Sequence, residues 1–235
     1  MPVLLTNIAS YIPEGRENNL KRVFQLGTDE EFLREKVGTC QVSRRAAGEE
    51  TSDLCVRAFA KLEAASGLRR DLVNVLVVVT QNPDGNGIPH TSAIVHGKVG
   101  LSEGCAAFDL SLGCSGFVYG LNVLHSFMSA QQFDYGVIIT CDPYSKIIDP
   151  GDKNTTLLFG DAATATLLRS SGSTAKGWRI GPSLFGTSGA RGRALHNDEA
   201  KLAMDGRAVF NFSATVVPEQ LKALLERSAV TIDEI

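Results

Sequence analysis

The chain has 235 residues, of which 43% are hydrophobic and 21% charged, a composition that excludes a largely disordered or fibrous protein. Its net charge of −3 gives no electrostatic basis for binding nucleic acid or an anionic membrane surface. No basic leader followed by a long apolar core opens the sequence, and no apolar run reaches the length of a bilayer. We therefore expect a cytoplasmic protein that binds neither nucleic acid nor membrane.

The first part of the chain alternates between segments typical of strands and of helices. Residues 71–80 are apolar on both faces, which is typical of a central strand in a sheet covered on two sides. Residues 117–132 are apolar almost all round, which favours an interior helix. In chain order we expect a strand over 3–11, helical pieces over 17–37, a helix over 51–66, a strand over 71–80, a helix over 90–99, a strand over 105–110, a helix over 117–132 and a strand over 135–141.

The remaining residues begin the same pattern again. We expect a pair of strands over 155–159 and 163–168, a linker over 170–177, strands over 178–180 and 201–204, and a helix over 209–227. Such alternation predicts an α/β protein. We divide it into a first domain over residues 1–170 and a second over 171–235. Because the second domain stops after one helix, we expect it to be truncated, with apolar faces left open.

The five cysteines are odd in number and form no CxxC pair, which argues against a zinc site or a disulfide framework. The DGNG sequence at residues 84–87 lacks the later ligands of a calcium loop, so no metal site is expected. Free cysteines mostly pack as small buried hydrophobic residues. We expect this of four of them: Cys40, Cys55, Cys105 and Cys141.

The fifth cysteine, Cys114, lies in the segment FDLSLGCSGFVYG, between a predicted buried strand and a predicted buried helix. Helix N-termini carry partial positive charge and free N–H groups, which favour a thiolate and can stabilise the oxyanion of an acyl-transfer reaction. The flanking Gly113 and Gly116 allow a sharp turn and close backbone approach. The alternative is a tight turn in which the cysteine is only a small filler.

Four segments in the right order and spacing resemble one family. They are TQNPDGNGIPHTSAIVHGKVGL, FDLSLGCSGFVYGL, LLFGDAATATLL and AMDGRAVFNF. Over nearly its whole length the chain resembles the β-ketoacyl-acyl-carrier-protein synthase III family of the thiolase superfamily. The resemblance implies two related α/β halves in five layers, the second of them incomplete in this chain.

The same resemblance implies an acyltransferase of fatty acid or polyketide-like biosynthesis. Cys114 matches the family's nucleophile, which takes an acyl group from acyl-CoA and passes it to a malonyl group on acyl carrier protein. The backbone N–H of Cys114 would contribute to an oxyanion hole. The implied partners are acyl-CoA, acyl carrier protein and a second copy of the chain in a homodimer. No permanently bound cofactor is implied, because the thioesters supply the chemistry.

Two further positions match substrate-binding positions of the family. Ile88 matches a residue that reaches across the dimer to shape the partner's acyl pocket; the alternative is local packing of a loop residue. Lys153 stands where relatives often have an arginine near the adenine of coenzyme A. Lysine can neither stack on an aromatic ring nor form two parallel hydrogen bonds as arginine does. The affinity for the acyl donor and the type of donor are therefore in question. The alternative for Lys153 is a solvated loop residue.

The family's other catalytic residues are a histidine in a His-Gln-Ala-Asn motif and a later asparagine, and we expect both to fall beyond Ile235. None of the four histidines in the chain lies in such a motif. We expect His90 to be a loop or cap residue, His125 a core residue and His196 part of a polar loop. His90 and His96 are six residues apart, a poor spacing for a metal pair on one helix face.

Two other functions stay open at this point. Some relatives transfer the acyl group to a hydroxyl, amine or other non-malonyl acceptor. A protein of a different class is also compatible with the sequence, namely a non-catalytic thiolase-fold subunit, since the distal catalytic residues are missing. Retention of Cys114 in its Gly-Cys-Ser-Gly setting argues against the non-catalytic reading.

Overall fold

A computed structural model describes residues 2–170 and 176–234, which group into two compact units. Unit 1 comprises Met1–Glu17, Ser43–Pro143 and Gly160–Ile180, and unit 2 comprises Asn18–Val42, Tyr144–Phe159 and Gly181–Ile235. The predicted boundary at residue 170 separates the two halves of the expected fold, whereas these two units are groups of residues that contact one another. The predicted boundary therefore stays a prediction. Most of the expected linker, at residues 171–175, lies outside the described residues.

Unit 1 is built on a six-stranded mixed sheet with the order β5-β4-β6-β7-β1-β8. Its strands are β1 (Val3–Tyr11), β4 (Val75–Val79), β5 (Ala106–Leu110), β6 (Tyr135–Cys141), β7 (Ala163–Ser170) and β8 (Trp178–Arg179). The strand β4 pairs in parallel with both β5 and β6. The remaining pairs, β6 with β7, β7 with β1 and β1 with β8, are antiparallel.

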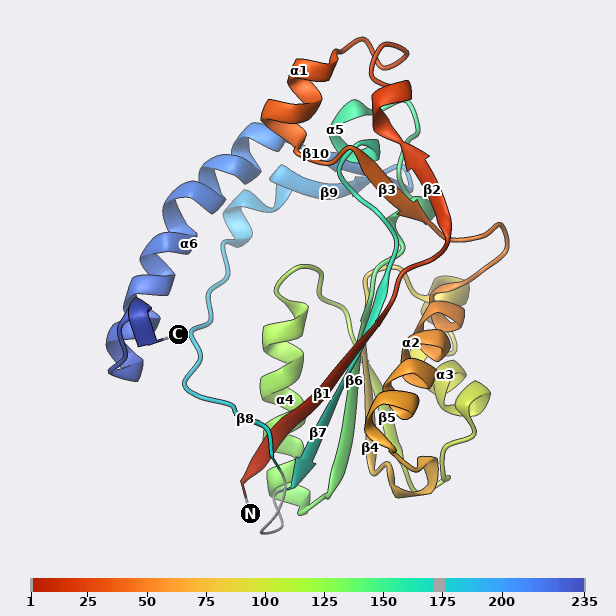
Figure 1. The fold of residues 1–235 in the computed structure, drawn as a ribbon, viewed down its shortest axis with the longest axis vertical. Coiled ribbons are helices and arrows are strands. Elements are labelled where there is room, and N and C mark those ends of the chain that lie inside the picture. Colours follow the sequence, from red (N-terminus) through yellow and green to blue (C-terminus); the bar gives the residue numbers. More distant parts are fainter. Residues whose placement is uncertain (1, 171–175, 235) are drawn as a thin grey trace. The chain divides into compact units, whose positions relative to one another are not determined.

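Helices cover both faces of this sheet (Figure 1). The helices α2 (Thr51–Ser66) and α3 (Thr91–Val99) pack on one face, and α4 (Gly116–Gln131) packs on the other. Alternate residues of β4 therefore enter different hydrophobic clusters: Leu76 and Val78 face α2 and α3, while Val77 and Val79 face α4. Burial on both sides explains why this strand is apolar throughout and confirms it as a central strand.

The helix α2 begins and ends where the sequence predicts. Glu50 and Asp53 form a reciprocal capping box at its start, and Gly67 ends it with a left-handed φ of 66°. Its apolar row, which includes Leu54, Ala58 and Leu62, is fully buried in the cluster beneath. Local capping and burial against the sheet thus specify the same segment.

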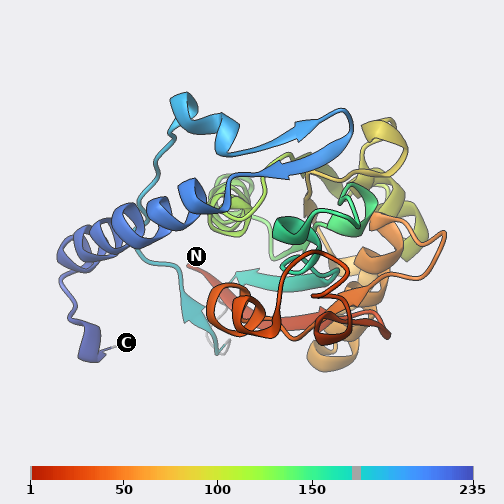
Figure 2. The same ribbon diagram turned by 90° about the horizontal axis from the view of Figure 1, so that it is seen from above.

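The helix α4 approaches the sheet through a row of residues spaced by four. The row is Gly116, Gly120, Leu124 and Met128, and all four are buried. A Cβ on Gly116 would collide with the side chain of Val79, and one on Gly120 would collide with that of Ile138. Only glycine allows the backbone of α4 to lie so close to the sheet. Figure 2 looks almost along the axis of this helix.

The prediction that α4 is buried on all sides is wrong for the described chain. Val118 is 45% exposed and Val123 is 39% exposed. The sheet covers one side of a helix, and the apolar residues on its other side face outward here. The apolar pattern predicted burial without showing which element would provide it.

Unit 2 contains small helices, a hairpin and one long helix. Its elements are η1 (Asn19–Lys21), α1 (Glu30–Phe32), η2 (Leu33–Val37), η5 (Tyr144–Lys146), α5 (Lys153–Thr156), η6 (Gly189–Ala194), β9 (Leu195–Asp198), β10 (Lys201–Met204), α6 (Gly206–Ser228) and η7 (Ile232–Glu234). A small core of Val23, Leu33 and Leu157 holds the first of these together. Buried Asn19 donates hydrogen bonds through its side chain to the backbone oxygens of Thr39 (2.7 Å) and Leu157 (2.8 Å).

A few short elements complete the chain. The strands β2 (Gly15–Asn18) and β3 (Gln41–Arg44) form a two-stranded sheet, and η3 (Arg70–Leu72) is a single 3₁₀ turn. The segment η4 (Asp84–Gly87) is a turn with left-handed backbone angles at Gly85 and Asn86. No helix within the described residues is both long and apolar enough to cross a membrane.

Two predictions of secondary structure in unit 2 are wrong. Residues 155–159 do not form a strand, because Asp152 caps the short helix α5 by accepting from the Asn154 N–H (3.0 Å) and the Thr155 hydroxyl (2.7 Å). His196 lies in the strand β9 and not in a loop. The hairpin between β9 and β10 turns at Glu199 and Ala200, both with positive φ, so it lacks the glycine or asparagine that usually marks such a turn.

The close packing of α4 gives a first testable prediction. Gly120→Ala is expected to lower the free energy of unfolding by about 1–3 kcal/mol, because its methyl group meets fully buried Ile138. The matched control is Gly97→Ala in α3, where a Cβ meets nothing within 4 Å, and there we expect a gain of about 0.5–1 kcal/mol from helix propensity alone. Urea unfolding of both variants measures this, and equal effects would refute the packing constraint.

Candidate active site

Cys114 lies at the edge of the sheet where the parallel strands end. It falls between the end of β5 at Leu110 and the start of α4 at Gly116. The N–H of Thr80, just after β4, donates to the backbone oxygen of Leu110 (3.1 Å), which joins the ends of the two strands. In α/β sheets this edge is where loops and helix N-termini gather, and ligands bind there preferentially.

The backbone around Cys114 turns tightly into the helix. The N–H of Gly116 donates to the oxygen of Gly113 (2.7 Å), and Ser115, the N-cap residue, gives no side-chain cap to α4. The first turn of a helix carries N–H groups that have no partner within the helix. Such groups beside a thiol suit the chemistry of acyl transfer, in which a carbonyl oxygen becomes negative.

The five cysteines differ sharply in accessibility. Cys114 is exposed, as a nucleophile must be, whereas Cys55, Cys105 and Cys141 are buried as predicted. Cys40 is also exposed, so the expectation that it packs inside is wrong. It follows Thr39 in the connection before β3, where the backbone pairs with Asn19 but the cysteine side chain faces outward.

Burial also changes the acidity of the inner thiols. Desolvation raises the pKa of Cys105 to about 11. The pKa of Cys141 is raised by a hydrogen bond with the thiol of Cys55 and by its own burial. Both thiols are therefore poor nucleophiles near neutral pH, since the thiolate is the reactive form.

Three carboxylates fix the loops at this edge, and the sequence analysis assigned none of them a role. Asp142, after β6, accepts from the N–H of Gln81 (2.7 Å), the hydroxyl of Thr80 (3.2 Å) and the amide of Asn82 (3.2 Å). Burial raises the pKa of Asp142 and these hydrogen bonds oppose the rise. The loop after β4 is thereby tied to the end of β6.

The other two carboxylates cap helices. Asp109 on β5 accepts from the N–H groups of Thr91 and Ser92 (both 2.7 Å) at the start of α3. Asp84 accepts from the N–H (3.0 Å) and hydroxyl (2.5 Å) of Ser52 at the start of α2. Asp84 opens the DGNG sequence, so this carboxylate serves the fold. A lone aspartate after a strand gives no sign in sequence of which distant helix it will cap.

Ile88 lies at the tip of the loop that these carboxylates hold. Its side chain is 88% exposed, and the following bond to Pro89 is cis. It joins none of the hydrophobic clusters among the described residues. Local packing, the alternative considered for Ile88, is therefore not what the structure shows.

Lys153 belongs to unit 2, where it opens α5. Its Nζ lies 5.1 Å from the centre of the Phe32 ring, a cation–π arrangement. Phe32 in turn lines a groove of about 710 Å³ within unit 2. Its other lining residues are Lys36, Val37, Asn154, Leu158, Met204, Asp205, Gly206, Arg207, Val209 and Phe210. The groove thus combines apolar walls with cationic side chains.

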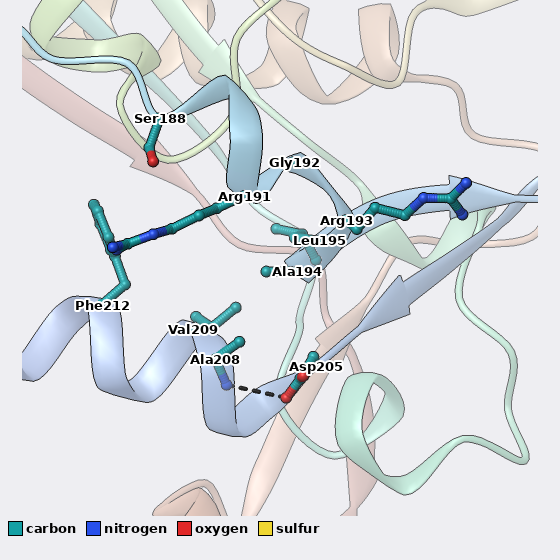
Figure 3. Close-up of a pocket in the computed structure, with 10 residues that line it drawn as sticks. All are labelled: Ser188, Arg191, Gly192, Arg193, Ala194, Leu195, Asp205, Ala208, Val209 and Phe212. Carbon is teal, nitrogen blue, oxygen red and sulfur yellow. Dashed lines mark hydrogen bonds between the residues drawn. The ribbon is translucent and has the colours of Figure 1, made fainter.

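A second pocket of unit 2, of about 540 Å³, lies between η6 and the first turns of α6 (Figure 3). Ala208, Val209 and Phe212 line it from the helix side, and Arg191 and Arg193 line it from η6. Asp205 at its edge is held by a hydrogen bond from the N–H of Ala208 (3.0 Å). Sequence analysis did not find this pocket, because the turn that carries the arginines has no helical periodicity.

The histidines are dispersed. His90 is exposed at the N-cap position of α3, as expected, and His96 Nε2 lies 2.9 Å from the oxygen of Ser102. The expectation that His125 is a core residue is wrong, because it is only half-buried on α4. No group of three or more potential metal ligands occurs among the residues that the structure describes.

Comparison with known proteins supplies the family. The sequence model of 3-Oxoacyl-[acyl-carrier-protein (ACP)] synthase III matches residues 108–189, which include Cys114. The β-ketoacyl-[acyl-carrier-protein] synthase III of Lactococcus lactis subsp. cremoris (strain MG1363) is 32% identical over 98% of this chain and 74% of its own. The chain belongs to the β-ketoacyl-acyl-carrier-protein synthase III family.

Solved structures of the synthase III family agree. A crystal structure of a 3-oxoacyl-(acyl-carrier-protein) synthase III has a TM-score of 0.90 and 28% identity, covering 100% of this chain and 77% of that one. The synthase III of Pseudomonas aeruginosa PAO1 has a TM-score of 0.87 and 30% identity, with coverages of 98% and 72%. The predicted thiolase-like α/β fold of a condensing-enzyme family of fatty acid biosynthesis is confirmed.

Accessibility of the thiols gives a second testable prediction. With iodoacetamide at pH 8, we expect Cys114 and Cys40 to be modified, because both are exposed. Cys105 should stay unmodified, since a thiol of pKa about 11 is ionised in about one molecule in a thousand at that pH. Peptide mass mapping of native and unfolded protein measures this. Rapid modification of Cys105, Cys55 or Cys141 in the native protein would contradict the described burial.

Proposed function

We propose that Cys114 accepts an acyl group from acyl-CoA as a thioester, in the manner of a synthase III enzyme. The observation that carries this proposal is an exposed cysteine at the N-terminus of α4, at the carboxyl edge of the parallel strands. Membership of the family supports it, as does the match of the family model across this segment. The other three cysteines of unit 1, Cys55, Cys105 and Cys141, are buried.

The acylation step balances without a cofactor. The Cys114 thiolate attacks the carbonyl carbon of the donor thioester, forming a new carbon–sulfur bond while the carbonyl oxygen becomes negative. Collapse of this intermediate breaks the bond to the CoA sulfur, and the CoA thiolate takes up the proton that Cys114 released. Backbone N–H groups at the start of α4, including that of Cys114, would stabilise the oxyanion. No permanently bound cofactor or metal is part of this proposal.

The acyl group would then pass to a malonyl group on acyl carrier protein with loss of carbon dioxide. By the resemblance, a histidine and an asparagine catalyse this second step. The 235 residues contain no His-Gln-Ala-Asn motif. We therefore propose that the 235 residues load the acyl group but do not complete the condensation. The competing function, a non-catalytic subunit, predicts that even the loading fails.

The groove of unit 2 fits an anionic donor that carries an aromatic ring. Lys36 and Arg207 line it, and Lys153 lies over the ring of Phe32 at its wall. Phosphate groups are attracted by such cations, and an adenine can lie against an aromatic face. We propose that this groove binds the nucleotide end of acyl-CoA, with lysine giving a weaker contact than arginine would.

A homodimer is the proposed assembly. The strand β5 is at the end of the sheet order and pairs, within the described chain, with β4 alone. A free edge of this kind can extend its sheet by pairing with a second copy. Ile88 is exposed and can contact such a partner. Its loop is held by the hydrogen bonds of Asp84 with Ser52 and of Asp142 with Gln81.

The loading step can be tested by intact mass. The protein is incubated with acyl-CoA donors of increasing chain length, and the expected result is a gain of one acyl group that is lost in Cys114→Ala. Cys40→Ala is the matched control, because Cys40 is the other exposed cysteine, and it should be loaded like the wild type. Adding malonyl-acyl-carrier protein should leave the adduct in place.

Two results would count against Cys114 as the acyl acceptor. An adduct that survives Cys114→Ala would show that another residue takes up the acyl group, and the absence of an adduct with any donor would favour the non-catalytic subunit. Release of a condensed product on adding malonyl-carrier would show that the second step does not need the missing residues. Transfer to an added alcohol or amine would favour the non-malonyl acceptor.

The donor groove can be tested through Lys153. Lys153→Ala should raise the Kd for coenzyme A by about three- to tenfold, the order expected for loss of one exposed cationic contact. Lys153→Arg should lower the Kd, because a guanidinium can stack on an aromatic ring and form two parallel hydrogen bonds. Lys21→Ala, which removes an exposed lysine of the same unit, is the control and should bind as the wild type does. Calorimetric Kd values that are equal for all four proteins would exclude Lys153 from the donor site.

A further inference from the structure

Two of the buried cysteines, Cys55 and Cys141, lie against each other in the core of unit 1. Cys55 is on α2, and Cys141 is the last residue of β6. Both belong to the hydrophobic cluster that α2 and α3 form with the sheet, and they are 0% and 2% exposed. Both are free thiols, and a hydrogen bond joins their side chains. The proposed acylation makes no use of this pair.

The first turn of α2 fixes the contact between the two thiols. Thr51 begins the helix, so its backbone oxygen accepts from the N–H of Cys55, four residues later. The thiol of Cys141 donates to the same oxygen (3.7 Å). On its strand, Cys141 pairs with Ala163 of β7, which is also buried. The backbone of two packed elements therefore holds Cys141 within one helical turn of Cys55.

This contact distinguishes the pair from the third buried cysteine. A disulfide requires two β-carbons that lie close together and side chains that point toward each other. Thiols that already share a hydrogen bond meet this requirement with small side-chain rotations. Cys105 is buried as well, but its thiol donates to the backbone oxygen of the neighbouring Ala106 (3.5 Å). It therefore serves as the matched comparison for burial without a thiol partner.

The two thiols of the pair have different roles in an oxidation. The pKa of Cys141 is raised by its hydrogen bond with Cys55, by burial and by the negative charges of Asp142 and Asp161. Cys141 therefore keeps its proton and directs it toward its neighbour. Since the thiolate is the reactive form of cysteine, this leaves Cys55 to react first and Cys141 to complete the bond.

We propose that Cys55 and Cys141 are a modification site at which hydrogen peroxide converts the two thiols into a disulfide that ties α2 to the end of β6. The bond depends on the packing of α2 against β6 and not on the chemistry at Cys114. It forms whether or not the proposed acylation takes place. A dithiol reductant reverses it by thiol–disulfide exchange.

The oxidation balances with hydrogen peroxide as the only oxidant. The sulfur of Cys55 attacks one peroxide oxygen and the O–O bond breaks, which gives a sulfenic acid and, with the proton from Cys55, one water. The sulfur of Cys141 then attacks the sulfur of Cys55. The S–S bond forms, the S–O bond breaks, and the departing hydroxide takes the proton of Cys141 as a second water. Two electrons pass from the two thiols to the peroxide.

Local opening of α2 gives the oxidant access to the pair. Hydrogen peroxide is close to water in size, and Cys55 lies in the second turn of the helix, near its start. The ends of helices open more often than their middles. A sulfenic acid formed there lies beside Cys141 and is shielded from further oxidant when the helix closes. It is therefore converted to a disulfide and not to a sulfinic acid.

The bond encloses the part of the chain that carries the proposed nucleophile. It closes a loop of about 90 residues, which contains β4, α3, β5, α4 and Cys114. A crosslink across a long loop stabilises a protein mainly by restricting its unfolded state. We expect the disulfide to raise the midpoint of thermal unfolding by about 5–15 °C.

The test begins with the variant that carries Cys40→Ala and Cys114→Ala, in which the cysteines that remain are the three buried ones. The folded protein is treated with hydrogen peroxide, freed of the oxidant, unfolded in iodoacetamide and digested without reductant. We expect one linked pair of peptides that carry Cys55 and Cys141 and have together lost two hydrogen atoms. Cys105 should be recovered in the alkylated form.

The digestion needs chymotrypsin as well as trypsin. Cys105 and Cys141 both lie between Lys98 and Lys146, and the sequence has no lysine or arginine between these two lysines. Trypsin alone would therefore leave both cysteines on one peptide. The same double digestion of the wild-type chain, treated in parallel, should give the same linked pair, which shows that the two exposed cysteines do not direct the bond.

Matched variants separate the bond from general effects of oxidation. Cys105→Ala in the same background should still form the disulfide and gain the same rise in the thermal midpoint. Cys55→Ala should form none, and its midpoint should be equal with and without peroxide. Each variant is compared with itself before and after oxidation, so a loss of stability from the substitution does not affect the result. Dithiothreitol should return every oxidised sample to its starting midpoint.

Four results would overturn the proposal. One is the absence of a linked peptide in the folded protein, and another is a bond that joins Cys105 as often as it joins Cys55 with Cys141. A third is a bond that appears only when peroxide is added after unfolding in urea, because the folded contact would then have no part in it. The fourth is a bond that forms without a rise in the thermal midpoint. None of these measurements involves an acyl donor, so they leave the proposed function untouched.

Discussion

The close contact between α4 and the central strand β4 is the constraint on which the proposed site depends. Gly116 and Gly120 have no side chains to hold the helix away from Val79 and Ile138, so the backbone itself rests on the sheet. Leu124 and Met128 continue the same row and anchor the helix in the core. The start of α4 is thereby fixed at the end of β5, and Cys114 is placed at that junction. A reactive thiol gains precision from a rigid support.

Around this junction, carboxylates fix the loops. Asp142 joins the loop after β4 to the end of β6, Asp109 caps α3 and Asp84 caps α2. Each satisfies backbone or side-chain donors that would otherwise lose water without gaining a partner, which is costly. Polar contacts therefore hold the loops at the carboxyl edge of the sheet. Among the cysteines of unit 1, Cys114 is the one that is exposed.

The two units differ in how completely they bury their apolar residues. In unit 1 the strands and helices cover one another, and two large clusters fill both faces of the sheet. In unit 2 the cluster around Val23 and Leu33 is small, and α6 buries none of its residues. The hydrophobic effect scales with the area removed from water, so unit 2 gains less from folding than unit 1. This contrast, more than any single contact, distinguishes unit 2 from unit 1.

The sequence by itself determined the features that depend on local pattern. The capping box and Gly67 specified α2, the unbroken apolar run specified β4, and the Gly-Cys-Ser-Gly turn singled out Cys114. Four segments in the right order indicated the family, because a motif can be recognised from its residues without knowing which contacts they make. The α/β class followed from the alternation of strands and helices.

Only the tertiary structure decided what depends on residues far apart in the chain. Asp152 overrode the strand pattern at 155–159, and the hairpin at Glu199 and Ala200 formed without its usual turn residues because pairing of β9 with β10 supports it. The partners of Asp142 and Asp109, the exposure of Cys40 and the exposure of Phe210 on α6 likewise have no local signature. An apolar residue shows that it favours burial, but whether it is buried is decided by the element that arrives to cover it.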